Sequence, residues 1–494
     1  MTRNSRAVLS PFFAGVIALC GCAAGFGAEA FAQHAPGPKS AAPETVKALM
    51  VSDIHFEPFW DPGKVAKLAA APESGWKAIL AAPDSADREQ SFSSLEENCQ
   101  TRGADTSYPL LASSLRAMRA DAGGAKFITV SGDLMAHSFD CKYKALFPQA
   151  LPGDYRAFVE KTIAFVMGEL RETFPGVPVY AALGNNDSDC GDYQLDAHSA
   201  FLADTGKIAA ADFPAPERKT AEEDFAAGGD FNAALPIPHT RMVVLDDVFM
   251  ARKYKTCEGQ PDAPAAASQI AWLKQQLDDA RSQKEKVWVM AHIPPGVDPY
   301  STAIRSGNLC ADEQPQMFLS SEELAETLAR YGDVIELAIF AHTHMDELRL
   351  LIDRKSAGLH QPVAVKMVPS ISPVDGNDPA FTVAAIDPAS AMLVDYRVFA
   401  ASNQTGVGTE WSEEYDYAKD YDEPAFSAPA VGDLVEKFAA DGAAQTPVSE
   451  SYLSHYFVGA GGRADELKLF WPMYVCALDH DEAEAYRECV CAGK

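Results

Sequence analysis

Five short apolar segments of this sequence are each followed by residue types that bind metal ions. The segments span residues 48–52, 126–131, 177–183, 287–291 and 335–341, and their short runs bounded by polar residues predict fully buried strands. Because the carboxyl ends of strands form the active-site edge of an α/β sheet, we expect the residues that follow them to meet. These residues are Asp53, His55, Asp133, Asn185, His292, His342 and His344.

The residue types in this set predict a centre with two metal ions. Carboxylates and imidazoles suit Zn, Mn or Fe, and a side-chain amide adds a neutral oxygen ligand. A carboxylate can bridge two ions about 3.5–4 Å apart. A single histidine is more often a hydrogen-bonded structural residue than a ligand. Here, however, four of the 11 histidines lie directly after strands, as Asp133 and Asn185 do, so the pattern as a whole indicates a site.

Other segments predict an α/β fold with insertions. A further strand is expected at 241–245, and helices are expected at 268–280, with Ser268 as N-cap, and at 321–331, just before Gly332. In the first helix, Ile270, Leu273 and Leu277 share one face. Residues 56–110 and 198–240 are long enough to be insertions between these elements.

The first residues indicate export. Arg3 and Arg6 precede an apolar stretch over 7–24, and Ala30 and Ala32 fit a small-x-small cleavage site, so residues 1–32 are predicted to be a signal peptide. An uncleaved membrane anchor and lipidation at Cys20 or Cys22 are the alternatives. Residues 33–44, rich in Pro and Ala, are interpreted as a flexible lead-in. We expect a periplasmic or secreted protein without a transmembrane helix in its mature chain.

Eight cysteines remain beyond the predicted signal, and in an oxidising compartment they predict disulfides. Eight cysteines allow 105 complete pairings, so the connectivity stays open. Nearness in sequence favours a bridge from Cys476 to Cys489 or Cys491. From about residue 401 the chain is first acidic and aromatic and then predicts short helices.

The net charge limits the partners of the protein. The chain carries 70 acidic and 41 basic residues, a formal net charge of −29. Such a surface repels nucleic-acid duplexes and anionic membranes and disfavours long polyanions, unless a local basic patch overrides it.

The order of these motifs resembles the calcineurin-like metallophosphoesterase family. The matching blocks are SDIHF, SGDLMAH, LGNND, MAHIPPG and FAHTHMDE, with Ala341 where the family usually has glycine. His137 in the second block, the AHIPPG sequence and residues 369–381 resemble the acid sphingomyelinase-like phosphodiesterase branch more narrowly. The resemblance covers about residues 46–400, and the C-terminal tail more loosely.

The resemblance implies an α/β (α+β) fold, a four-layer β-sandwich flanked by helices. It would occupy residues 45–400, with a small helical, disulfide-bearing region over 401–494. It also implies two divalent metal ions, with Zn²⁺ preferred and Mn or Fe as alternatives. The implied ligands are Asp53, His55, Asp133 and His344 for one ion, and Asp133, Asn185, His292 and His342 for the other.

The implied activity is hydrolysis of a phosphodiester or phosphoanhydride bond by a metal-activated hydroxide. His137 resembles the histidine that protonates the leaving oxygen. Asn186, the second candidate catalytic residue, stands where most of the family has a catalytic histidine. GNND resembles the endopolyphosphatases of this branch, and Asp187 is expected to orient its neighbours. Lipid headgroups such as that of sphingomyelin, nucleotides and polyphosphate all stay open as substrates, as does the oligomeric state. The alternatives are a phosphomonoesterase acting on nucleotides or phosphoproteins, and an inactive metal-binding exported protein.

Overall fold

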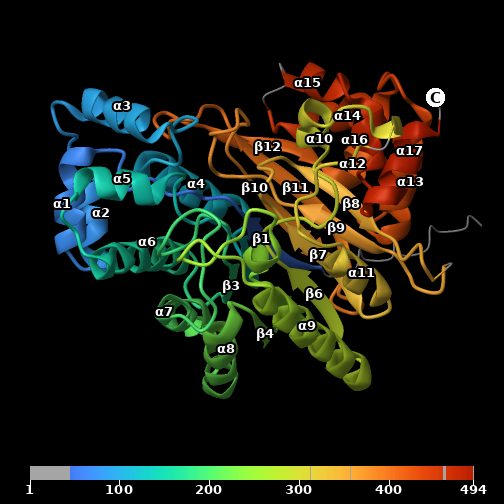
Figure 1. Ribbon diagram of the computed structural model, residues 1–494, viewed down its shortest axis with the longest axis horizontal. Coiled ribbons are helices and arrows are strands. Elements are labelled where there is room, and N and C mark those ends of the chain that lie inside the picture. The colour runs from blue at the N-terminus through green and yellow to red at the C-terminus, as the bar shows by residue number, and fades with distance from the viewer. Residues whose placement is uncertain (1–44, 312, 357, 460–462, 493–494) are drawn as a thin grey trace, which may run out of the picture. The chain divides into compact units, whose positions relative to one another are not determined.

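The computed structural model describes residues 45–311, 313–356, 358–459 and 463–492, which belong to one compact unit (Figure 1). The predicted signal peptide, lead-in and lipidation sites lie outside the described residues. In the described part of the chain, no helix is both long and apolar enough to cross a bilayer.

Two six-stranded sheets form the core of this unit. In the first sheet, β1 pairs in parallel with β2, β2 with β3, and β1 antiparallel with β10. Its order is β12 (Trp411–Asp416), β11 (Leu393–Ala401), β10 (Ala380–Ile386), β1 (Val46–Val51), β2 (Phe127–Ser131) and β3 (Val179–Ala182).

The second sheet is also mixed, since β5, β6, β7 and β9 run parallel while β4 and β8 are antiparallel edge strands. Its order is β4 (Phe231–Ala234), β5 (Thr240–Val244), β6 (Lys286–Met290), β7 (Ile335–Phe340), β9 (Val363–Met367) and β8 (Glu347–Leu351). The six strands expected from the sequence are therefore β1, β2, β3, β5, β6 and β7.

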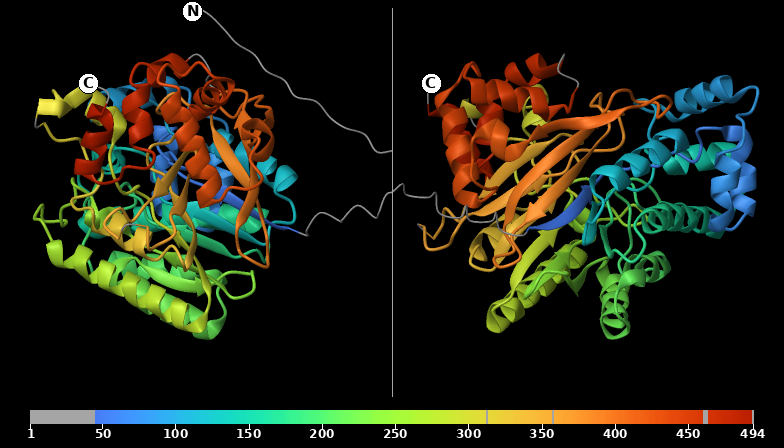
Figure 2. Two further views of the ribbon diagram at one scale, coloured as in Figure 1. Left: turned by 90° about the vertical axis from the view of Figure 1, so that its right-hand side faces the viewer. Right: turned by 180° about the vertical axis from the view of Figure 1, so that it is seen from behind.

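The sheets pack face to face, with helices on their outer sides (Figures 1 and 2). Phe127 of β2 and Trp288 of β6 meet across the interface at 5.7 Å between ring centroids, and the Trp288 indole donates to the Ala391 carbonyl. Helices α4 (Tyr108–Asp121) and α7 (Ala200–Ala209) contact the first sheet, and α9 (Ala263–Gln283), α11 (Glu323–Arg330) and α13 (Ala428–Ala440) contact the second. The expected fold class, a sandwich flanked by helices, is confirmed.

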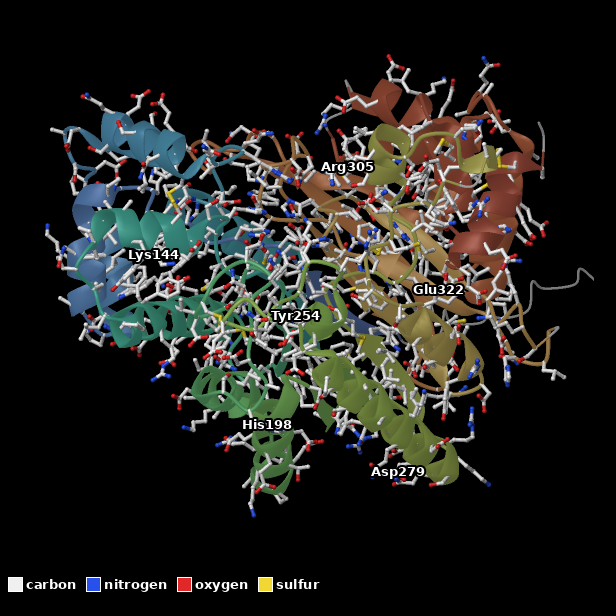
Figure 3. The ribbon with its side chains drawn as sticks, in the orientation of Figure 1. Lys144, His198, Tyr254, Asp279, Arg305 and Glu322 are labelled. Atoms are coloured by element: carbon white, nitrogen blue, oxygen red, sulfur yellow. A yellow bond between two sulfur atoms is a disulfide. The ribbon has the colours of Figure 1, made fainter. Side chains whose placement is uncertain are left out.

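The two predicted insertions fold into helices that extend beyond the sandwich (Figure 1). The first contains α1 (Pro62–Ala70), α2 (Trp76–Leu80) and α3 (Arg88–Cys99), which lie beside α5 (Phe139–Leu146) and α6 (Pro152–Thr173). The second contains α7 and α8 (Ala215–Gly228), together with β4. Exposed side chains such as Lys144 on α5 and Asp279 on α9 point away from the protein (Figure 3).

The C-terminal region is helical, as expected, but it begins with strand β12 of the first sheet. Its helices are α12 (Tyr417–Tyr421), α13, α14 (Pro447–Tyr456), α15 (Ala464–Lys468), α16 (Trp471–Cys476) and α17 (Ala483–Cys491), and α10 (Pro299–Arg305) packs against α16.

Helix α9 begins earlier than its sequence predicts. It starts at Ala263, so the expectation that Ser268 caps it is wrong. Pro264 lies in the first turn, where the missing N–H costs nothing, and the alanines that follow are strong helix formers. The expected apolar face is confirmed, since Ile270, Leu273 and Leu277 are buried.

Four disulfides join the described cysteines. The favoured bridge, Cys476–Cys489, is confirmed, while Cys491 pairs with Cys310, 181 positions away. The others are Cys99–Cys141 and Cys190–Cys257.

Removal of the Cys99–Cys141 bridge should destabilise the protein. The bridge ties the end of α3 to α5 across 42 positions, so its loss frees a long loop in the unfolded chain. We expect the Cys99→Ala/Cys141→Ala variant to lose about 2–4 kcal/mol of unfolding free energy in urea denaturation. The unfolding free energy of the reduced wild type, compared with that of the oxidised form, gives the effect of losing all four bridges. An unchanged denaturation midpoint would contradict the prediction.

Candidate metal centre

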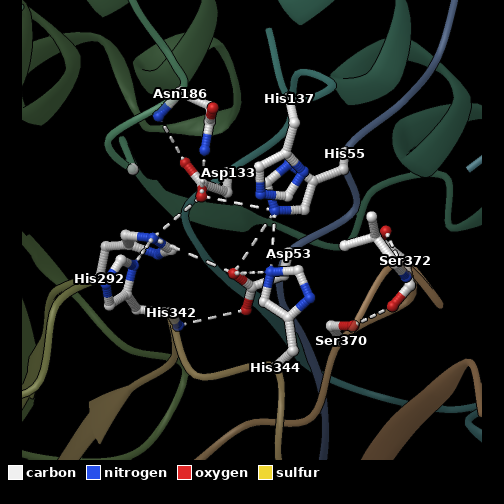
Figure 4. Close-up of polar contacts among 12 residues, drawn as sticks. Asp53, His55, Asp133, His137, Asn186, His292, His342, His344, Ser370 and Ser372 are labelled. Atoms are coloured by element: carbon white, nitrogen blue, oxygen red, sulfur yellow. Dashed lines mark hydrogen bonds and ion pairs between the residues drawn. The ribbon is translucent and has the colours of Figure 1, made fainter. Parts of the chain in front are cut away.

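Six of the seven predicted ligands meet at one edge of the two sheets (Figure 4), and the seventh, Asn185, precedes Asn186, whose backbone N–H donates to Asp133. The seven residues follow β1, β2, β3, β6 and β7, the strands from which the sequence placed them. Asp133 lies at the middle of the cluster, with its Oδ2 3.4 Å from His55 Nε2 and 3.2 Å from His292 Nε2. Side chains separated by up to 291 positions therefore share one site.

Asp53 completes the cluster on the other side. Its Oδ1 lies 3.5 Å from His344 Nε2, 3.8 Å from His55 Nε2 and 4.0 Å from His292 Nε2. This buried oxygen has no hydrogen-bond partner among the described residues. An unpaired buried carboxylate oxygen is costly, so it indicates a ligand that the cluster is built to hold.

The four imidazoles are oriented as metal ligands usually are, with one ring nitrogen turned inward and the other facing a carbonyl, hydroxyl or carboxylate oxygen. The outer nitrogens of His55 and His292 lie 2.8 Å from the carbonyl oxygens of Met135 and Ser131. His342 turns Nδ1 to the centre, 3.3 Å from His292 Nε2, while its Nε2 lies 3.2 Å from Tyr193 Oη. His344 turns Nε2 inward, 3.1 Å from His55 Nε2, and its Nδ1 faces Asp375 Oδ2 at 3.5 Å.

Asn185 is oriented in the same manner. Its Nδ2 donates to Asp192 Oδ1 at 2.7 Å, which leaves its Oδ1 as the free atom. That oxygen is buried and has no hydrogen-bond partner in the described part of the chain. The side-chain amide therefore offers the neutral oxygen that the sequence predicts.

The electrostatics of the centre favour cations. Burial disfavours the charged ring of His55, but Asp133 and Asp53 outweigh it and raise the pKa of His55 to about 10. Burial and the neighbouring His292 lower the pKa of His342 to about 3, so the imidazoles cannot all hold protons together. Divalent ions would replace these protons, since metal binding requires neutral imidazoles and ionised carboxylates.

The donor set fits two ions. Asp53, His55 and Asp133 offer ligand atoms within 4.8 Å of one another, and so do Asp133, His292 and His342. Asp133 belongs to both groups, as a bridging carboxylate must.

Five of the seven residues have left-handed backbone conformations. The φ angles are +43° for Asp53, +42° for His55, +53° for Asp133, +71° for His342 and +66° for His344. Such conformations are uncommon for residues other than glycine and cost on the order of 1 kcal/mol or more each. The surrounding fold therefore holds the ligand loops in strained turns that aim the side chains inward.

Buried carboxylates hold these loops in place. Asp187 accepts hydrogen bonds from the backbone N–H groups of Leu134, Met135 and Gly184 at 2.9–3.0 Å, so it joins the Asp133 loop to the Asn185 loop. Asp247 accepts from the N–H of Ile293 at 3.0 Å. The orienting role expected of Asp187 agrees with these bonds, whereas no motif in the sequence points to Asp247.

Glycine is required where two loops approach closely. A Cβ on Gly184 would lie 2.2 Å from Asp133 Oδ1, and one on Gly132 would lie 2.7 Å from His292 Nδ1. The glycines of the GD and GN motifs therefore let the ligand loops touch.

His137 covers the centre from the side of His55. The two rings stack at 4.0 Å between centroids, and the His137 side chain is 25% exposed. Asp105 accepts from the His137 backbone N–H at 2.8 Å and lies 3.0 Å from its Nδ1, while Ser372 Oγ donates to Asp105 at 2.8 Å. Burial alone would raise the pKa of Asp105, but the adjacent His137 outweighs this effect and the pKa is lowered. Asp105 lies far from every recognised motif, so sequence reasoning missed it.

Asn186 contacts the Asp133 carboxylate directly. Its side-chain Nδ2 donates to Asp133 Oδ2 at 2.9 Å, and its backbone N–H donates to Asp133 Oδ1 at 2.8 Å. Its amide therefore fixes the orientation of Asp133. Participation of Asn186 in the reaction itself stays a prediction.

Residues 46–346 match the family model described as calcineurin-like phosphoesterase, which is more than half of the chain. The chain belongs to the calcineurin-like phosphoesterase family. The metallophosphoesterase resemblance drawn from the motifs is thereby confirmed, and with it the enzyme class, a metal-dependent phosphoric ester hydrolase. Members of the family use divalent metals, and this chain has His and Asp clusters that could bind them.

Within the calcineurin-like phosphoesterases, the chain is similar to acid sphingomyelinase-like phosphodiesterases. It is 25% identical over 402 residues to the mouse cyclic GMP-AMP phosphodiesterase SMPDL3A, covering 78% of this chain and 82% of the relative. It is 26% identical over 410 residues to human acid sphingomyelinase-like phosphodiesterase 3b, covering 78% and 81%. It is also 24% identical over 324 residues to sphingomyelinase phosphodiesterase C of Dictyostelium discoideum, covering 63% and 66%.

Proposed function

We propose that this protein is an exported phosphodiesterase with a two-metal centre. Asp53, His55, Asp133 and His344 would hold one divalent ion, and Asp133, Asn185, His292 and His342 the other. Zn²⁺ suits the imidazole-rich donor set best, with Mn or Fe as alternatives. The names of the relatives support a phosphodiester bond as the target, and the eight paired cysteines support an oxidising compartment.

The observation that carries this proposal is the orientation of the donors. Each of the four imidazoles directs one nitrogen inward while a carbonyl, hydroxyl or carboxylate faces the other. The buried oxygens Asp53 Oδ1 and Asn185 Oδ1 have no partner in the described residues. A purely structural cluster would pair these atoms with one another, because buried polar groups without partners are costly.

Divalent ions at these sites would supply Lewis acidity and lower the pKa of a coordinated water. The protein's own part is orientation and proton transfer. Asn186 fixes the Asp133 carboxylate, and Asp105 holds His137 through its Nδ1. With Nδ1 so occupied, the Nε2 of His137 is the ring atom left to give a proton to the leaving oxygen.

A comparison of substrates tests the proposal. We expect bis-p-nitrophenyl phosphate to be hydrolysed faster than p-nitrophenyl phosphate. Both release p-nitrophenolate, so the comparison isolates the preference of the centre for a phosphate with two ester bonds over one with an additional unesterified, charged oxygen. Dialysis against a chelator should abolish turnover, and added Zn²⁺ or Mn²⁺ should restore it. Elemental analysis should find about two metal ions per chain.

Two outcomes would each favour another function. A preference for the monoester would indicate a phosphomonoesterase acting on nucleotides or phosphoproteins. No turnover of either substrate at any metal loading would indicate an inactive metal-binding protein.

A further inference from the structure

The centre meets solvent at two of its side chains. His137 has a side chain that is 25% exposed and His342 is half-buried, whereas Asp53, His55 and His292 are fully buried. A substrate must therefore approach between His137 and His342. Two basic side chains lie beside these points of entry, one near each.

Arg102 lies on the side of His344 and His137. Its Nη1 is 3.5 Å from Asp375 Oδ1, and the other oxygen of Asp375 is 3.5 Å from His344 Nδ1. The Arg102 side chain is 72% exposed, so most of its N–H donors face water. Asp375 is also held by Arg463, which donates to its backbone carbonyl, so the loop that carries Asp375 has a fixed position beside the centre.

Lys253 lies near His342. Its Nζ is 4.7 Å from the ring centroid of Tyr193, whose hydroxyl lies 3.2 Å from His342 Nε2. Lys253 is exposed, and no ion pair joins it to a carboxylate of the described residues. The disulfide Cys190–Cys257 ties together the two segments that carry Tyr193 and Lys253.

The chain as a whole has a net charge of −29. The overall field opposes anionic substrates, so cations at the entrance change which substrates can bind. We infer that Arg102 and Lys253 form a subsite, outside the metal ligands, for a second phosphate group adjacent to the one that reacts. This inference rests on the proposed function and narrows it, because a substrate with one phosphate cannot use the subsite.

Charge-removing variants test the subsite. The ratio of kcat/KM for inorganic tripolyphosphate to kcat/KM for bis-p-nitrophenyl phosphate should fall about tenfold in Arg102→Gln and in Lys253→Gln, chiefly through a higher KM. ATP serves as a second polyphosphate substrate, and its ratio should fall equally. Lys219→Gln is the matched control, since Lys219 is 78% exposed on α8 and does not contact the centre.

The outcomes separate the inference from the function on which it rests. Unchanged ratios in both variants, an equal fall in Lys219→Gln, or no hydrolysis of tripolyphosphate by the wild type would each overturn the subsite. A fall in the kcat/KM ratio for ATP alone would also overturn the subsite, because it would mean that Arg102 and Lys253 recognise the nucleoside and not a second phosphate group. If no protein in the series hydrolyses bis-p-nitrophenyl phosphate, the proposed function fails instead.

Discussion

Replacement of Asp133 by asparagine should remove metal and activity together. Asp133 lies between the two groups of ligands, 3.4 Å from His55 and 3.2 Å from His292. Asparagine keeps the shape but loses the charge that holds two cations at once. Because metal ions contribute several kcal/mol to such reactions, we expect kcat/KM to fall at least about 10³-fold. Elemental analysis should show a matching loss of bound metal.

The control for this experiment is Asp279→Asn on the exposed side of α9 (Figure 3). It removes the same charge far from the centre and should leave metal content and turnover as in the wild type. Circular dichroism would establish that Asp133→Asn is folded. A folded Asp133→Asn protein with two ions and wild-type turnover would disprove the bridging role.

Replacement of His137 by alanine should slow hydrolysis in proportion to how much the leaving group needs a proton. We expect a loss of about 10²–10⁴-fold on a diester with a poor alkoxide leaving group. The loss should be small on bis-p-nitrophenyl phosphate, because p-nitrophenolate leaves without protonation. Asp105→Asn should show the same dependence with a smaller loss, since Asp105 acts by holding the His137 ring.

His198→Ala serves as the control, since His198 is exposed and belongs to the second insertion (Figure 3). Ring nitrogens of His137, His55 and His344 lie within 4.8 Å of one another, so His137 could also bind a metal ion. The metal content of His137→Ala distinguishes this role from proton transfer. Loss of an ion from His137→Ala would make it a ligand. Equal losses on good and poor leaving groups would exclude proton donation.

The position of the site could be predicted from the sequence because it depends on strand ends. Buried strands have short apolar runs, and the residues after them, such as Asp53 and His292, must lie at the sheet edge. The helices of the insertions were harder to predict. Helices α1, α2 and α7 have at most 10 residues, and α3 and α8 are longer but bury only two residues each, so no apolar face marks them in the sequence. The start of α9 was misplaced because Ser268 fits the chemistry of an N-cap while Pro264 already begins the helix.

The residues that hold the site together could not be found in the same way. Asp105 reaches His137 across 32 positions and Asp247 reaches Ile293 across 46, and nothing in their local sequence distinguishes them from surface aspartates. The left-handed turns at Asp53, His55 and His344 are equally unpredictable, since positive φ angles are uncommon for any residue other than glycine. These features depend on tertiary packing, which overrides local preference.

The left-handed turns at the predicted ligands imply a trade-off between thermal stability and activity in this protein. Glycine at Asp53 or His344 would relieve about 1 kcal/mol of backbone strain at each position and remove a crowded polar group. Laboratory evolution for survival at high temperature, carried out in metal-poor medium, would therefore favour sequences that have lost the catalyst while keeping the scaffold. A screen for robust variants of this protein has to select for turnover in the same round.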